Sequence, residues 1–120
     1  MRTVTIAVQM LVRLCFLVLL VLGVLFWTGH YTTLVSLHMA VGGIFVLGLW
    51  TLTILGARAR VGGALVATAA VGGLVVLGLG MAQTQMMVGS MHWVVRVLHL
   101  LVGLAAIGLT EQIGARIKRA

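Results

Sequence analysis

The sequence has no proline, no aspartate, a single cysteine and a single acidic residue, Glu111. Without proline, no helix in the chain is expected to be interrupted by a missing backbone donor. One cysteine, Cys15, rules out a disulfide framework. With no aspartate, and with Cys15 expected far from every histidine, no nucleophilic triad can be assembled. We therefore expect neither hydrolysis nor a catalytic role for this chain on its own.

Polar residues are also scarce, because 62% of the 120 residues are hydrophobic and only 8% are charged. A soluble chain of this length needs a polar shell around its core, and this composition cannot provide one. We therefore expect a lipid bilayer to form the outer layer. The formal net charge is +7, but the basic residues stand at the ends of apolar segments rather than on one face. Nucleic acid is accordingly not expected as a partner.

Four apolar stretches are long enough to cross a hydrocarbon core, which takes roughly 20 helical residues. We predict a single transmembrane domain over residues 1–120, with helices near 10–29, 32–56, 63–82 and 92–112. Short connections predict antiparallel neighbours, and hence an all-α membrane protein with a four-transmembrane-helix up-and-down bundle. No small-residue cleavage signal follows the first stretch, so we expect it to be retained rather than removed as a signal peptide.

The distribution of basic residues predicts the orientation of the bundle, because Lys and Arg in short loops are retained on the cytoplasmic side. In a four-helix topology seven basic residues fall on one side: Arg2, Arg13, Arg58, Arg60, Arg116, Lys118 and Arg119. Only Arg96 falls towards the other. We expect a multi-pass protein of the bacterial inner (cytoplasmic) membrane with cytoplasmic N- and C-termini. Arg13 is expected to reach the interface along its flexible stem, and Glu111 either to take up protons at the inner face or to mark a solvated helix end.

The second half of the chain resembles the first. The segment Leu37–Gly42 aligns without gaps on Leu98–Gly103, and the two share Leu, His, Val and Gly. Each follows a glycine-rich apolar helix, in which Gly23 of the first half corresponds to Gly78 of the second. The pattern predicts two repeated helical hairpins related by an axis along the membrane normal. Such an axis places the histidines of the two segments at equal depth.

Two histidines, His38 and His99, are predicted inside membrane spans, in the outer half of the bilayer. An ionisable residue within a span is costly to bury and is by default a functional hypothesis. A b-type haem needs two axial ligands from opposite sides, and neutral imidazoles on facing helices meet that need. Gly42 and Gly103 follow the histidines by four residues on the same helix face and would leave room for a flat macrocycle. Because no C-x-x-C-H motif is present, such a haem would be bound noncovalently.

Three further residues are predicted near this site. Arg96 is the only outer cation, lies three residues before His99, and is suited to pair with haem propionates. His92 lies two turns before His99 on nearly the same face, and His30 takes the equivalent boundary position. We expect His30 and His92 at the haem edge or at a quinone headgroup. A second haem, a surface metal and a hydrogen bond to a neighbouring helix are alternatives for them.

The two His-x-x-x-Gly motifs, on the second and fourth helices of a compact bundle, resemble the four-helix membrane cytochromes b. These include the b561-like proteins and the cytochrome b anchors of quinone-linked complexes. The resemblance covers the whole chain in architecture, but only His38, Gly42, His99 and Gly103 in motif. It implies electron transfer through a bis-histidine haem. The b561-like proteins typically carry two haems stacked across the membrane, whereas this chain lacks an inner histidine pair, so we expect one haem b.

One outer haem cannot carry electrons across a bilayer, so we expect partner subunits of a respiratory or photosynthetic complex. A quinol or a periplasmic electron carrier would then deliver or remove electrons. Two other functions are alternatives. The first is a pigment-binding accessory subunit, in which the same histidines ligate chlorophyll. The second is a cofactor-free assembly or copper-handling protein. The copper alternative is based on thioethers near His92, in a group formed by Met81, Met86, Met87 and Met91.

The glycines and other small residues also have a purely structural interpretation, since they let membrane helices approach closely. Ala64, Thr68 and Gly72 form a stripe at spacing four on the third predicted helix. This stripe predicts that the third helix packs closely against its neighbours.

Overall fold

The computed structural model describes residues 1–120 and consists of four long helices without strands. The helices are α1 (Arg2–Trp27), α2 (Val35–Arg58), α3 (Gly63–Ala82) and α4 (His92–Arg119). Short 3-10 turns lie at Thr32–Leu34 and Gln83–Gln85. All four helices are long and apolar enough to cross a membrane. The predicted all-α, four-transmembrane-helix bundle is thereby confirmed.

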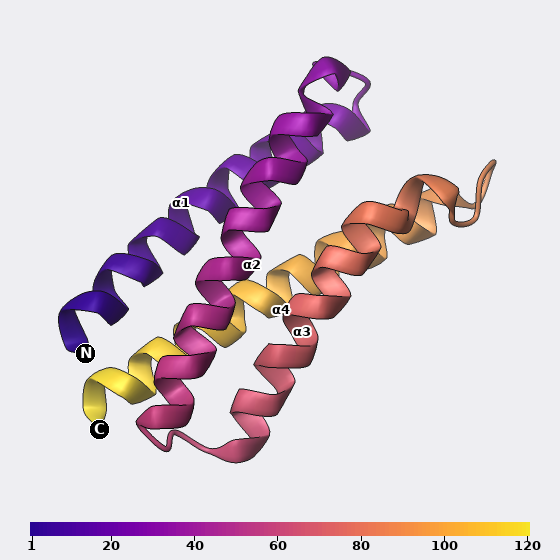
Figure 1. Ribbon diagram of the computed structural model, residues 1–120. Helices are drawn as coiled ribbons and strands as arrows, with labels where there is room; N and C mark the ends of the chain where they lie inside the picture. The colour runs from indigo at the N-terminus through magenta and orange to yellow at the C-terminus, as the bar shows by residue number, and fades with distance from the viewer.

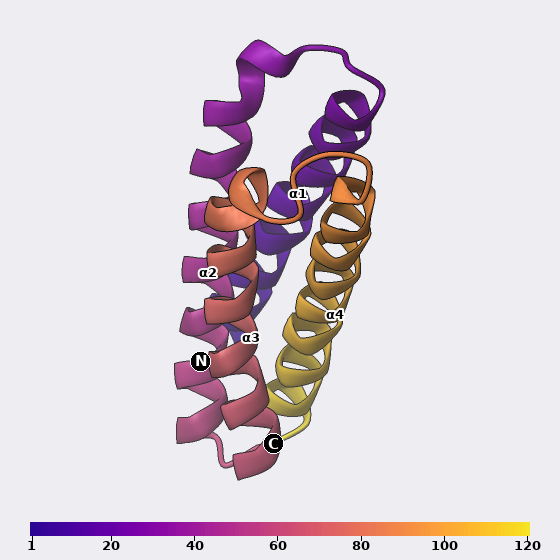
Figure 2. The same cartoon turned by 90° about the vertical axis from the view of Figure 1, so that its right-hand side faces the viewer.

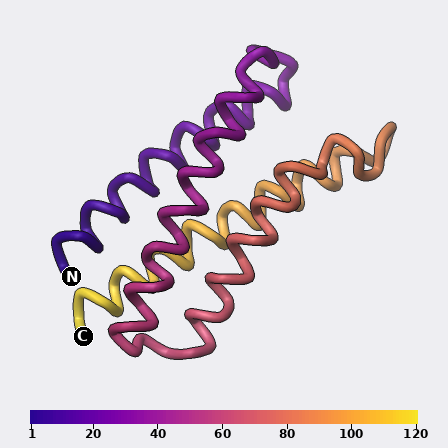
Figure 3. Tube along the Cα trace, in the orientation of Figure 1, coloured from indigo at the N-terminus to yellow at the C-terminus, as the bar shows by residue number.

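The helices form two antiparallel hairpins, α1/α2 and α3/α4 (Figure 1). α2 contacts all three other helices, whereas α1 and α3 do not contact each other. Both chain termini and the α2–α3 connection lie at one end of the bundle, here called the terminal end (Figure 3). The connections 28–34 and 83–91 lie towards the other end, here called the turn end. The molecule measures 47 × 24 × 16 Å, so its long axis exceeds a hydrocarbon core of about 30 Å.

The surface of the bundle is apolar along all four helices. Only 20 of the 120 residues are buried, and many large apolar side chains are exposed. Monomeric soluble proteins rarely expose continuous apolar surface on this scale. Hydroxyl groups within the helices are satisfied internally, since Thr51, Thr53 and Thr68 each donate to the carbonyl four residues earlier. These features are those of a multi-pass membrane protein.

The helices at the two ends of the chain are longer than predicted. α1 begins at Arg2 rather than near residue 10, and α4 ends at Arg119 rather than near residue 112. The two additional segments pack against each other at the terminal end. Gln9 is buried, and its side chain fills the space that a Cβ would occupy at Gly114. The prediction from hydropathy ended both helices too early, because their terminal segments contain polar residues. In the structure these segments are stabilised by packing against each other.

The hydrophobic core extends from the middle of the bundle to the terminal end. It consists of Val12, Cys15, Phe45, Val46, Leu49, Leu52, Ala69, Ala106, Ile113 and Ile117. Gly48 lets the α2 backbone approach Val12, and an added Cβ there would overlap that side chain. Towards the turn end the two hairpins diverge (Figure 1), and the side view separates α1 from α2 at their connection (Figure 2).

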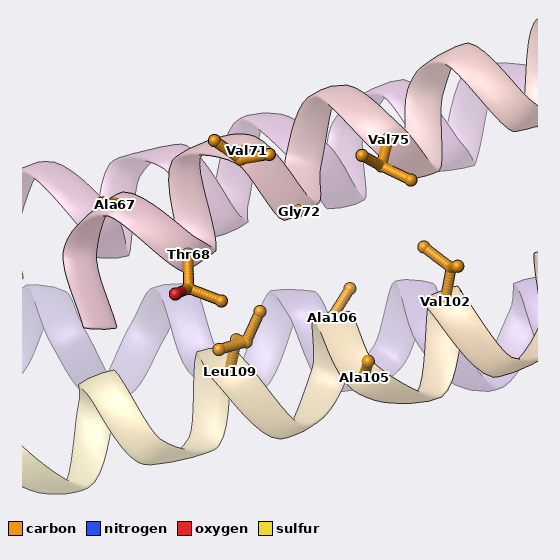
Figure 4. A pocket seen from close by; sticks show the side chains of 9 residues that line it. All are labelled: Ala67, Thr68, Val71, Gly72, Val75, Val102, Ala105, Ala106 and Leu109. Carbon is orange, nitrogen blue, oxygen red and sulfur yellow. The ribbon is translucent and has the colours of Figure 1, made fainter. Parts of the chain in front are cut away.

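α3 packs closely against both of its neighbours, as the sequence predicts, because an added Cβ at Gly73 would overlap Trp50 of α2 and one at Gly72 would lie 3.3 Å from Leu109 of α4. The stripe itself does not face the core, since Ala64 and Thr68 are exposed whereas Ala69 and Gly73 are buried. The cause is Trp50 of α2, which lies against Gly73 and donates from its indole N–H to the carbonyl of Ala70. The stripe instead contributes to an apolar cavity of about 490 Å³ between α3 and α4, shown in Figure 4.

The contact between Trp50 and Gly73 predicts the effect of a single methyl group. Gly73→Ala should lower the free energy of unfolding by about 1–3 kcal/mol, because overpacking forces the indole away from its carbonyl partner. The measurement is thermal unfolding in detergent micelles followed by circular dichroism. The matched control is Gly78→Ala on the same helix, where an added Cβ meets no atom within 4 Å. Equal unfolding temperatures for the two variants would contradict the proposed contact.

Candidate functional site

Two histidines from different hairpins meet near the turn end of the bundle. His38 lies in the first turn of α2, and His99 lies two turns into α4. Their ring centroids are 6.4 Å apart, with the ring planes inclined by 52°. The contact lies where the hairpins begin to diverge, outside the hydrophobic core. It is the only close ring contact between the two hairpins.

Neither imidazole of this pair makes a hydrogen bond. The Nδ1 atoms of His38 and His99 are shielded from solvent and have no partner. Buried side-chain polar atoms are bonded in the large majority of cases, and leaving one unpaired costs about 1–3 kcal/mol. Two unpaired imidazoles side by side are therefore an unfavourable arrangement for packing alone. They are free to bind a ligand that lies between or beside them.

Each imidazole is covered by a glycine from the other helix of its own hairpin. A Cβ at Gly23 would lie 3.7 Å from Cε1 of His38, and a Cβ at Gly80 would lie 3.4 Å from Cε1 of His99. Phe26 completes the surroundings of His38 with an edge-on ring contact, centroid to centroid 5.5 Å. An added Cβ at either position would make an ordinary van der Waals contact with the ring. The two hairpins thus hold their histidines in the same way.

Sequence reasoning missed Gly80 and paired Gly23 with Gly78 instead. Gly78 faces open space, with no atom within 4 Å of an added Cβ. Distance from the turn does not identify this pair, because Gly80 lies three residues before the 83–91 connection and His99 lies eight residues after it. The exact register depends on the length of that connection, which local motif alignment ignores.

The predicted pocket glycines lie in different surroundings. An added Cβ at Gly42 would make an ordinary contact with Leu19 of α1 at 3.8 Å, whereas one at Gly103 would meet nothing within 4 Å. Space therefore exists beside Gly103, one turn from His99. Arg96 is exposed and makes no hydrogen bond or ion pair, so its guanidinium is available to an anionic group.

The boundary histidines are held separately by local hydrogen bonds. His30 follows Gly29, whose φ of +82° ends α1, and its Nδ1 lies 3.0 Å from the hydroxyl of Thr28. His92 begins α4, and its Nδ1 donates to the carbonyl of Met86 at 3.0 Å. Neither ring packs against the His38–His99 pair. The structure therefore brings together only two of the four histidines.

The spacing of the pair fits two ligands on opposite sides of one metal. Metal–imidazole bonds to zinc are about 2.0–2.1 Å long, so the ligand nitrogens lie about 4 Å apart and the ring centroids about 6 Å. The observed 6.4 Å agrees with this arrangement. No group of three or more His, Cys, Asp or Glu residues occurs in the structure.

A second polar centre lies between α1 and α4, and sequence reasoning missed it. Arg13 donates from Nε and Nη2 to the two carboxylate oxygens of Glu111 at 2.8 and 2.7 Å. Gln9 adds a longer hydrogen bond to the same carboxylate. The expectation that Arg13 and Glu111 are separately solvated is wrong. The available signal was the spacing of Thr5, Gln9 and Arg13, which share one face of α1.

Comparison with protein-family models, curated proteins and solved structures gives no match to this chain. The likeness to membrane cytochromes b therefore depends on the His-x-x-x-Gly motifs of the sequence alone. It stays a hypothesis.

The unpaired imidazoles predict an unusual response of the cofactor-free chain to mutation. His38→Leu or His99→Leu should leave its stability unchanged or raise it by about 1–2 kcal/mol, because each removes an unsatisfied buried nitrogen. Chemical unfolding in detergent would measure the effect.

Trp50→Phe is the control for this experiment, since it removes a polar group whose hydrogen bond is satisfied. That variant should lose about 1 kcal/mol. If the two histidine variants are destabilised as much as Trp50→Phe, the imidazoles serve packing and not ligand binding.

Proposed function

We propose that this chain is a b-type cytochrome subunit that binds one haem b through His38 and His99 and transfers electrons near one face of the membrane. The observation that carries the proposal is the pair of facing imidazoles, 6.4 Å apart, whose buried Nδ1 atoms have no partner. The two ligands come from equivalent positions of two hairpins. This arrangement supports one axial ligand on either side of a single iron.

The residues around the pair have separate roles in this proposal. When bound, the haem supplies one-electron redox chemistry. His38 and His99 would occupy both axial positions, which favours electron transfer over oxygen binding. Gly23 and Gly80 orient the two rings, and the free space at Gly103 would admit the macrocycle. Phe26 keeps water from His38.

Arg96 is the cation available to the haem propionates. It lies one turn before His99 on α4, is exposed, and has no protein partner. A guanidinium binds carboxylates in a bidentate manner. His30 and His92, which already bond within their own turns, are assigned to the site edge, where a quinone headgroup could approach.

The orientation of the protein follows from its basic residues. Six of them belong to the terminal end: Arg2, Arg58, Arg60, Arg116, Lys118 and Arg119. Because Lys and Arg in short loops are retained on the cytoplasmic side, we infer that this end faces the cytoplasm of a bacterial inner membrane and that the histidine pair lies towards the outer side. A single outer haem requires partner subunits, with a quinol or a periplasmic carrier as electron donor or acceptor.

Absorption spectroscopy tests the cofactor directly. The protein, purified from membranes and reconstituted with haemin, should give the reduced-minus-oxidised spectrum of a low-spin, bis-histidine haem. Red or near-infrared bands in the natural preparation would identify a chlorophyll-type pigment instead. A colourless preparation that takes up no haem would refute the proposal and leave the assembly or copper-handling alternative.

Single substitutions should separate the ligands from the boundary histidines. His38→Ala or His99→Ala should abolish the low-spin spectrum, because an axial ligand is lost. His30→Ala and His92→Ala are matched controls and should retain it. Survival of the bis-histidine spectrum in either ligand variant would show that the assigned pair is wrong.

A separate prediction concerns the charge beside the haem. Arg96→Gln should leave the haem bound but lower its reduction potential, because a nearby cation favours the reduced state. The expected energy is on the order of 1 kcal/mol. Potentiometric titration measures the shift, and Arg116→Gln at the terminal end is the control. An unchanged or raised potential would remove Arg96 from the site.

A further inference from the structure

The Arg13–Glu111 ion pair faces away from the bundle, although both residues belong to membrane-spanning helices. The two side chains are 50% and 39% exposed. Arg13 lies eleven residues from the start of α1, and Glu111 lies eight residues from the end of α4. At about 1.5 Å per residue, these positions are roughly 17 and 12 Å from the helix ends. The pair is therefore set well in from the termini.

Large apolar side chains are exposed on α1 on both sides of the ion pair, and on α4 towards the turn end. They are Ile6, Met10 and Leu17 of α1, and Leu100 and Leu104 of α4. Charged residues within membrane spans almost always face the bundle interior or a water-filled cavity. The Arg13–Glu111 pair instead lies on the outer surface of the bundle. A second protein surface packed against it would shield both charges from the lipid.

A notch lies beside the pair on α4. Gly108 is one turn from Glu111, and an added Cβ there would meet no atom within 4 Å. Glycine in a transmembrane helix lets a second backbone approach closely. We define the α1–α4 face as the surface formed by Arg13, Glu111, Gly108, Leu17 and Leu104.

We propose that the α1–α4 face is the contact between two copies of this chain. Arg13 and Glu111 project side by side from neighbouring antiparallel helices, and their terminal atoms are in contact. A two-fold axis parallel to the bundle axis therefore places Arg13 opposite the partner's Glu111, and Glu111 opposite the partner's Arg13. Four charges then alternate in sign around the axis.

The hydrogen-bonding capacity of the pair fits this arrangement. A guanidinium has five N–H donors, and Arg13 uses Nε and Nη2 for its own Glu111. Its Nη1 has only the sulfur of Met10 as a partner, at 3.7 Å. A carboxylate oxygen is a better acceptor, and the partner's Glu111 would supply one. A second copy of the chain has the same ion pair at the same depth in the membrane. An unrelated helix would not in general have such a pair.

Energy transfer between labelled chains in lipid vesicles tests the contact. Full-length protein labelled at the C-terminus with donor or acceptor is reconstituted together, and then diluted with lipid. The wild type should show transfer that persists on dilution, as a dimer does. Gly108→Leu should abolish the transfer while leaving the helical circular dichroism unchanged, because its side chain begins in open space and would fill the notch.

Gly78→Leu is the matched control, since this glycine also faces open space but belongs to α3. It should retain the transfer. The double variant Arg13→Gln with Glu111→Gln removes the charges without leaving one unpaired, and should weaken the dimer. A monomeric wild type, a Gly108→Leu protein that still associates, or equal loss in Gly78→Leu would each overturn the proposal. None of these outcomes depends on haem binding.

Discussion

Close backbone packing through glycine in the terminal half of the bundle is the constraint on which the remaining architecture depends. In lipid, apolar side chains gain little by leaving their surroundings, so helices associate through tight packing and hydrogen bonds. Gly48 admits Val12, Gly73 admits Trp50, and Gly114 admits Gln9. These contacts draw the helices together towards the terminal end. Beyond them the hairpins diverge, and few side chains are buried there.

The divergence explains why the histidine pair can exist. In a tightly packed bundle, two adjacent imidazoles without hydrogen bonds would be replaced by apolar residues of similar size. At the turn end the rings are held by small neighbours, Gly23 and Gly80, and contact each other across the gap between hairpins. Their Nδ1 atoms have no hydrogen-bond partner within the chain itself. A ligand that binds both nitrogens would supply the missing interaction.

The two polar centres of the molecule differ in hydrogen bonding and in exposure. His38 and His99 are shielded but unpaired, whereas Arg13 and Glu111 are well paired but face outwards. A bound group could satisfy the unpaired nitrogens of the histidine pair. A second protein surface could shield the ion pair from lipid. The two recognition sites that we propose therefore differ in kind: an unpaired histidine pair between the hairpins, and a charged surface on the outside of the bundle.

Much of this structure was predictable from the local pattern of the chain. Four apolar segments with short connections determine the bundle, because every backbone group in lipid must be bonded within its own helix. The bounds of α3 were predicted as observed. Helices α1 and α4 were predicted too short, because their polar ends are stabilised by each other and not by their own hydropathy.

The sequence by itself determined the number of helices, their antiparallel order and the two equivalent segments around His38 and His99, since these depend on hydropathy, loop length and local motif. Only the tertiary structure decided which residues touch. It selected Gly80 rather than Gly78, turned the stripe of α3 towards a cavity, and joined Arg13 to Glu111. The physical reason is that helix rotation and axial register are set by side-chain fit between helices, and one bulky residue such as Trp50 is enough to change them.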